Sequence, residues 1–219
     1  MSEGTVWGVS EAEQARSTSG PWDESEIDFG DGVERVDLGA VLVAPREGVE
    51  VQVQVDQNTG TVTQLTLTRS DGAVQIQPYA APRSGGLWDD IRRQLASSIT
   101  TSGGVVEEAD GPFGIELRAQ VMAGDGSSGL QPARFVGVEG PRWFLRAVFL
   151  GLAARPSEVS EFFDSVVRDL VVVRGHEAMP VGSAIPMRLP DAADPAAPPA
   201  QTMTLPRLPE RGPEITETR

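Results

Sequence analysis

The chain has 219 residues, of which 39% are hydrophobic, and a formal net charge of -14. It contains no Cys, which excludes disulfides, thiolate metal sites, iron–sulfur ligation and Cys nucleophiles. All 18 basic residues are Arg, which excludes chemistry that needs a Lys amine, such as Schiff-base formation. The negative charge makes general binding to nucleic acid or to an anionic membrane unfavourable.

The two ends differ in composition from the middle. Residues 1–34 carry nine acidic side chains and one Arg, with few apolar residues to offset the entropy of ordering. Residues 179–219 contain nine Pro, which remove backbone donors and block helix formation. We therefore expect a disordered acidic N-terminal tail over 1–34, a single α+β domain over 35–178 and a Pro-rich disordered C-terminal tail over 179–219.

The sequence shows no sign of membrane insertion or secretion. No stretch has the roughly 18 consecutive apolar residues that a membrane span needs. The N-terminus has no basic region followed by an apolar run. We expect a cytoplasmic protein without membrane contact.

Alternating apolar and polar residues predict strands in the first half of the middle region. The clearest run is 49–55, V-E-V-Q-V-Q-V, in which every second residue points outward. Further strands are expected over 36–43, 61–68 and 74–77. A helix is expected next, because five apolar residues recur at helical spacing before Gly103-Gly104. They are Leu87, Trp88, Ile91, Leu95 and Ile99.

The second half repeats this plan. Strands are expected over 113–121, 134–138 and 142–150, and the last is apolar on both faces and therefore central. A helix should start after Pro156 with Ser157 as its N-cap, followed by a short strand over 171–174. The expected fold is α+β: an antiparallel sheet, or two joined sheets, of two β-meander-plus-helix halves, with both helices packed on its apolar side.

Residues that could carry catalysis are few and scattered. His176 is the single His, and its place beside Glu177 at the margin of the predicted domain favours a solvated surface residue. Carboxylate pairs and Gly-rich turns occur, but none has the spacing of a metal site, a phosphate loop or a nucleophile elbow. We predict no catalytic residue, no metal site and no cofactor.

One candidate binding surface is neutral. Alternation predicts that one face of the first strands carries hydrogen-bonding side chains with almost no charge. Such a face is either ordinarily solvated or covered by a partner. Its residues are Gln52, Gln54, Gln64, Thr66, Thr68, Gln75 and Gln77.

The other candidate surface is a cluster of Arg side chains. Alternation predicts four of them on outward positions of neighbouring strands, where they would suit a carboxylate, a phosphate or the protein's own acidic head. They are Arg118, Arg134, Arg142 and Arg146. Alternatively, Glu116 and Glu139 neutralise them as cross-strand pairs.

Three segments resemble a known family. They are Gly111-Pro112-Phe113-Gly114-Ile115-Glu116, Gly140-Pro141-Arg142-Trp143-Phe144-Leu145-Arg146, and residues 162–180 with Arg174-Gly175 and Met179-Pro180. Over roughly residues 25–190 the chain resembles the actinobacterial domain-of-unknown-function family 3710. The resemblance implies an actinobacterial, cytoplasmic, single-domain protein. It carries over no functional residue, because the activity of that family is not established.

These observations lead to a functional hypothesis with two alternatives. We expect a non-enzymatic binding or adaptor domain for a protein partner, with the acidic head and the Pro-rich tail as flexible interaction arms. The first alternative is a small-molecule or nucleotide (anion) binding protein that uses the Arg cluster. In the second, residues 1–34 cover the Arg face and autoinhibit it.

Overall fold

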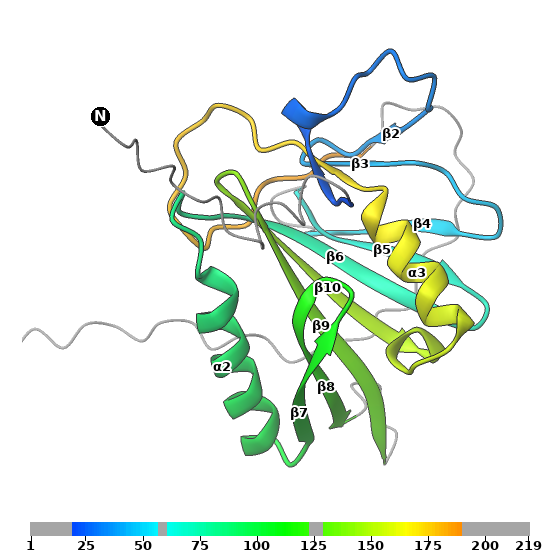
Figure 1. Ribbon diagram of the computed structural model, residues 1–219, viewed down its shortest axis with the longest axis vertical. Helices are drawn as coiled ribbons and strands as arrows, with labels where there is room; N and C mark the ends of the chain where they lie inside the picture. The colour runs from blue at the N-terminus through cyan, green and yellow to red at the C-terminus, as the bar shows by residue number, and fades with distance from the viewer. Residues whose placement is uncertain (1–18, 57–60, 123–128, 190–219) are drawn as a thin grey trace, which may run out of the picture.

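The computed structural model describes residues 19–56, 61–122 and 129–189. At its centre lies a seven-stranded antiparallel sheet in the order β4-β5-β6-β10-β9-β8-β7. The two predicted strand meanders meet where β6 pairs with β10, so they form one continuous sheet (Figure 1). Its strands are β4 (Glu50–Val55), β5 (Val62–Arg69), β6 (Gly72–Ala80), β7 (Val105–Gly111), β8 (Gly114–Met122), β9 (Leu130–Gly140) and β10 (Trp143–Gly151).

A second sheet of short strands packs against the large one. Its order is β1-β11-β3-β2, and β1 pairs with β11 in parallel. The strands are β1 (Trp22–Asp23), β2 (Val36–Asp37), β3 (Val41–Val43) and β11 (Val171–Val172). Val41 and Val172 belong to the same buried cluster as Leu65 and Ile76, so the two sheets share one core.

The two helices cover opposite faces of the large sheet (Figure 1). α2 (Leu87–Thr101) packs with Phe144 and Val148 of β10, whereas α3 (Glu158–Arg168) packs with Leu145 and Phe149 of the same strand. The prediction that both helices lie on one side is therefore wrong. The reason lies in β10, which has apolar side chains at both odd and even positions. Both faces of the sheet are therefore apolar there, and each is buried by a different helix. The prediction that β10 is central is confirmed by its place between β6 and β9.

The helix starts are fixed by hydrogen bonds. Ser157 is the N-cap of α3, as predicted, and its hydroxyl accepts a bond from the Ser160 N–H at 3.2 Å. The N-cap of α2 is Gly86, at φ 87°, which has no side chain to offer. Instead, the Glu139 carboxylate of β9 accepts bonds from the N–H groups of Gly86 and Trp88, both at 2.9 Å. This carboxylate suits the positive end of the helix dipole and ties α2 to the sheet.

The fold is wider than the predicted domain over 35–178. On the N-terminal side, Asp23 is 6% exposed and accepts a bond from the Trp143 indole N–H at 2.7 Å, just before the 3-10 helix η1 (Glu24–Glu26). On the C-terminal side, Met187 is buried and forms a β-bridge with Val62. The composition of these segments did not predict that they belong to the fold, because each is held by a few contacts, such as those of the buried Asp23 and Met187.

The remaining parts of the predicted tails, residues 1–18 and 190–219, lie outside the described residues. Across the ranges that the structure describes, no helix has the length and apolar character to cross a membrane.

Candidate functional site

The structure separates the four predicted Arg residues. Arg118 and Arg134 lie opposite each other on β8 and β9, on the face that α3 covers. Arg146 is paired with Gln77 and points to the other face, and Arg142 lies in the turn between β9 and β10. The expected cluster of four therefore does not form, and the idea that residues 1–34 cover one Arg face loses its basis.

The strand register explains this outcome. The turn between β9 and β10 pairs Gly140 with Trp143, so even positions of β9 share a face with odd positions of β10. Arg134 is accordingly opposite Phe149, whereas Arg146 is opposite Gly137. Residues 134 and 146 both have even numbers, but the two-residue turn between their strands places their side chains on opposite faces of the sheet.

Arg142 helps to hold the turn between β9 and β10. Its φ is 62°, in the left-handed region that non-glycine residues rarely adopt. Its guanidinium donates to the Gly175 carbonyl at 3.1 Å, and its own carbonyl accepts a bond from Arg174 Nε at 3.1 Å. Gly140 is required before the turn, because a Cβ there would lie 2.1 Å from the Trp143 ring. Two of the three family-like segments therefore meet at this turn.

The neutral face predicted from the sequence is confirmed. The register pairs Gln52 with Thr66 and Thr66 with Gln75, so these side chains share one side of the sheet. This is the side that α2 partly covers, over β7, β8 and β9. Gln75 is 7% exposed, and its Oε1 has no hydrogen-bond partner among residues 19–56, 61–122 and 129–189.

Arg146 lies on the same side as the neutral face. The Gln77 side-chain oxygen accepts bonds from the Arg146 guanidinium at 2.7 Å and from the Tyr79 hydroxyl at 2.6 Å. Burial raises the pKa of the Tyr79 phenol, and the positive charge of Arg146 partly opposes that rise. Arg146 is thus engaged by its own sheet.

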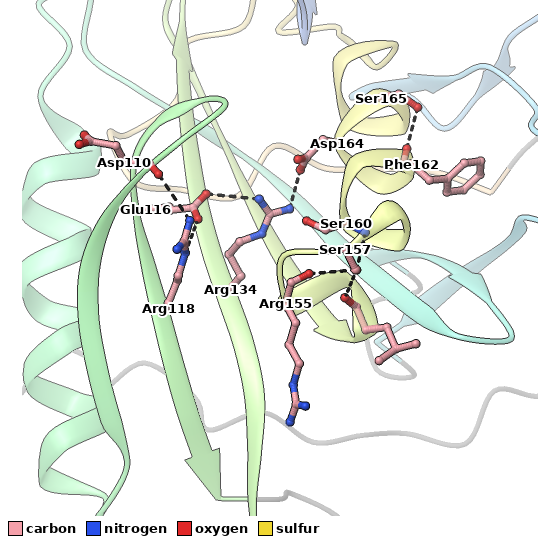
Figure 2. A network of polar contacts seen from close by, with 11 residues as sticks. Asp110, Glu116, Arg118, Arg134, Arg155, Ser157, Ser160, Phe162, Asp164 and Ser165 are labelled. Atoms are coloured by element: carbon pink, nitrogen blue, oxygen red, sulfur yellow. Dashed lines mark hydrogen bonds and ion pairs between the residues drawn. The ribbon is translucent and has the colours of Figure 1, made fainter.

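Four charged side chains form a buried network between β8, β9 and α3 (Figure 2). Glu116 accepts bonds from Arg118 Nε at 2.9 Å and from Arg134 NH1 at 3.3 Å, and Arg134 NH2 donates to Asp164. Glu116, Arg134 and Asp164 are 1%, 4% and 6% exposed. The two positive and two negative charges balance. These four residues are named the ion cluster.

The ion cluster fits the alternative in which acids neutralise the Arg side chains. Glu116 does so for Arg118 and Arg134, whereas Glu139 caps α2 instead. The Arg134 guanidinium also lies 3.8 Å from the centroid of the Phe149 ring, a cation–π contact. Breaking one member of such a buried network leaves an uncompensated charge, which strongly destabilises a fold.

The hairpin between β7 and β8 makes room for Glu116. Gly111 pairs with Gly114, whose φ is 99°, around a two-residue turn. A Cβ on Gly111 would lie 2.0 Å from the Glu116 carboxylate. At the turn, Phe113 packs against the core, and the Arg168 guanidinium of α3 is 5.2 Å from its ring. This family-like segment therefore positions the ion cluster.

A groove of about 340 Å³ lies beside the ion cluster. Its floor is formed by β7, β8 and β9 of the large sheet. Its opposite wall is the connection from the 3-10 helix η2 (Leu152–Ala154) to α3. The floor includes Val105, Glu107, Arg118, Gln120 and Pro132, and the other wall includes Ala154, Arg155 and Pro156. The Arg118 side chain is 37% exposed, and Arg155 is exposed and extends away from the ion cluster (Figure 2).

Large apolar side chains are exposed at the same end of the sheet. Val105 on the groove floor is 63% exposed, and Leu152 beside the other wall is 48% exposed. Met122 and Leu130, which pair at the ends of β8 and β9, are 52% and 46% exposed. Exposed apolar groups next to two guanidinium groups suit a ligand with both apolar and anionic parts.

His176 is exposed, as predicted. Within residues 19–56, 61–122 and 129–189, no three His, Asp or Glu side chains gather in a way that could hold a metal ion.

Sequence reasoning missed Asp164 and Arg155. A signal for Asp164 was present, because it is an acid between the apolar Phe163 and Val166 in the core-facing stripe of α3, and a charge there needs a partner. Arg155 gave no signal, because its role depends on where the η2 connection lies over the sheet.

Comparison with known families decides the relationship. The family described as "Protein of unknown function (DUF3710)" matches residues 20–196. The chain belongs to this family. The matched range reaches beyond both ends of the predicted domain and contains all three family-like segments.

Other comparisons add no function. No curated protein matches the sequence. A crystal structure from Bacteroides thetaiotaomicron VPI-5482 is 12% identical, with a TM-score of 0.38, over 64% of this chain and 48% of that one. The chain thus spans about half the length of that protein, and a likeness at this TM-score supports no conclusion.

Proposed function

We propose that this chain is a non-enzymatic, cytoplasmic binding domain whose groove takes an extended acidic segment of a protein partner. The observation that supports this most is the state of Arg118, which lines the groove while its Nε is bound to the buried Glu116. The orientation of the guanidinium is therefore fixed before a ligand arrives. A fixed Arg loses less entropy on binding a carboxylate, and two of its N–H groups together can hold both carboxylate oxygens.

The rest of the groove suits the same kind of ligand. Arg155 on the opposite wall adds a positive charge that, unlike the charge of Arg118, has no side-chain partner within the described residues. Val105 and Leu152 offer exposed apolar contacts on either side. Glu107 on the floor disfavours a ligand that is acidic at every position. An extended segment with alternating acidic and apolar residues fits these features.

The test is affinity purification of the tagged full-length chain from a related cell lysate, with mass spectrometry. We expect a partner that co-purifies with the wild type and is lost with Arg155→Glu. The matched control is Arg83→Glu, since Arg83 is also exposed and lies outside the groove. A partner that binds both variants equally, or the absence of any partner for the wild type, would contradict the proposal.

A second candidate function is binding of a small anion. The groove volume lies in the range of small-molecule sites, and two guanidinium groups line it. A thermal-shift screen against nucleotides and phosphorylated metabolites separates the two candidates. Stabilisation by such a compound that disappears in Arg155→Glu would favour the small anion over the protein partner.

A further inference from the structure

The two outermost strands of the large sheet differ in charge. Across the described part of the chain, no strand pairs with the outer side of β4 or of β7. β7 carries Glu107, Glu108 and Asp110, and charges of this kind protect a sheet edge from pairing with other chains. β4 alternates Val and Gln, has no Pro, and carries Glu50 as its one charge. An edge with this composition is open to another strand.

The regular part of the β4 edge is short. β4 pairs with β5 in one register from Glu50 to Gln54, and the register shifts between Gln54 and Val55. The regular stretch is therefore centred on Gln52. Val51 and Val53 pack against the core on the α3 side, whereas Gln52 and Gln54 belong to the neutral face.

We propose that β4 is the interface for a second copy of this chain, with the two β4 strands antiparallel about a twofold axis at Gln52. This register places Gln52 opposite Gln52 of the second copy, Val51 opposite Val53, and Glu50 opposite Gln54. No like charges meet, and the Glu50 carboxylate gains an amide donor. Such an isologous contact closes after two copies.

A twofold antiparallel pairing of two β7 strands would bring like charges together. Centred on the middle of Val105–Gly111, it places Glu108 opposite Glu108 of the second copy. Like charges directly opposite each other destabilise a strand pair. Self-pairing is therefore selective for the β4 edge.

The neutral face gives independent support. Behind Gln52 and Gln54, the next strand carries Thr66 and Gln64 on the same side, so no charge approaches the proposed contact from β5. Joining two copies at β4 makes the neutral faces continuous across the dimer. The low charge of the β4 and β5 part of this face, where Glu50 is the one charged side chain and which the groove does not use, then has a physical reason.

The test is sedimentation velocity of the full-length chain over a wide range of concentration. We expect a reversible shift from one chain of 23.3 kDa to two. Q52K places two positive charges on the axis and should weaken self-association by about tenfold or more. Q94K is the matched control, because it puts the same charge on an exposed position of α2, which packs over β7, β8 and β9 and not over β4, and it should associate as the wild type does.

A mixture provides the sharper test of the register. Q52E should dissociate as Q52K does, and mixing the two should restore dimers, because opposite charges then meet on the axis. A wild type that stays monomeric at every concentration overturns the proposal, as does a Q52K chain that associates like the wild type. If Q52K fails to fold, as its circular dichroism would show, Q52E alone decides by the same criterion.

Discussion

The two halves of the large sheet, on either side of β10, bury polar groups in different ways. In β7, β8 and β9, here the ionic half, the buried polar groups are charged and form ion pairs. Glu116 and Arg134 are nearly inaccessible and bonded to each other, and Arg134 is also bonded to Asp164 of α3, although its Nε has no partner among the described residues. In β4, β5 and β6, here the neutral half, the buried polar residue is the uncharged Gln75, whose Oε1 has no partner within the part of the chain that the structure describes. Both halves are antiparallel meanders with one helix following each in the chain.

The difference indicates separate roles. A buried ion pair tolerates little displacement, because its charges have lost their water and must keep their partners. The ionic half is therefore suited to hold Arg118 in a fixed place beside the groove. Neutral amide side chains do not need to keep a charged partner, so the neutral face can contact either solvent or a second copy of the chain.

Glu116→Gln tests the ionic half most severely. It removes the negative charge between Arg118 and Arg134 while keeping the shape of the side chain. We expect a loss of about 3–5 kcal/mol in the free energy of unfolding, measured with urea. Glu107→Gln, an exposed acid on the neighbouring strand, is the control and should change stability by less than about 0.5 kcal/mol. Equal effects of the two variants would show that the ion cluster is not a strong constraint.

Gly111→Ala tests the space that the hairpin leaves for Glu116. The added Cβ would lie 2.0 Å from the carboxylate, so either the hairpin or the ion cluster must shift. Overpacking of this kind should lower the free energy of unfolding by about 1–3 kcal/mol in urea titrations. Gly129→Ala is the control, since no atom of the described residues lies within 4 Å of its added Cβ. A stable Gly111→Ala chain would show that Glu116 can move freely.

Gln75→Leu tests the neutral half. It removes a buried acceptor that has no partner in the described part of the chain and replaces it with an apolar group. We expect the free energy of unfolding to rise by about 1 kcal/mol, opposite in sign to the effect of Glu116→Gln. The control is Gln120→Leu on the ionic half, where the side chain is exposed and no gain is expected. A large loss of stability in Gln75→Leu would contradict the contrast between the halves.

The smallest effect concerns Tyr79, the single Tyr of the chain. Because burial raises its pKa, tyrosinate absorbance of the folded protein should titrate above the usual value of about 10. The neutral phenol therefore favours the folded state below that pH, and this contribution is lost as the pH rises through the folded-state pKa. Arg146→Met should move the midpoint higher still, whereas Arg83→Met should leave it in place. A midpoint at the usual value would show that the phenol is solvated.

Local patterns in the sequence gave both helices, the neutral face and most strands of the large sheet. They missed β1 and β7, and they predicted one strand over 36–43 where the chain forms β2 and β3. Alternation from Val49 to Val55 and the Ser157 cap gave correct local structure, because both depend on neighbouring residues alone. The sides of the sheet covered by the helices, and the partners of Arg134, depend on pairing between distant strands. A single sequence gives that register only where the length of the turn between two strands is known. Counting the two-residue turn after Gly140 would have placed Arg134 and Arg146 on opposite faces.

Hydrogen exchange shows where a partner binds, and it can be measured on the full-length chain, free and in complex with the partner recovered from the lysate. We expect slower exchange on binding in β7, in β8 around Arg118, and in the connection from Leu152 to Pro156, with little change in β5 and β6. Protection confined to β5 and β6, with unchanged exchange around Arg118 and Arg155, would contradict the assignment of the groove as the binding site.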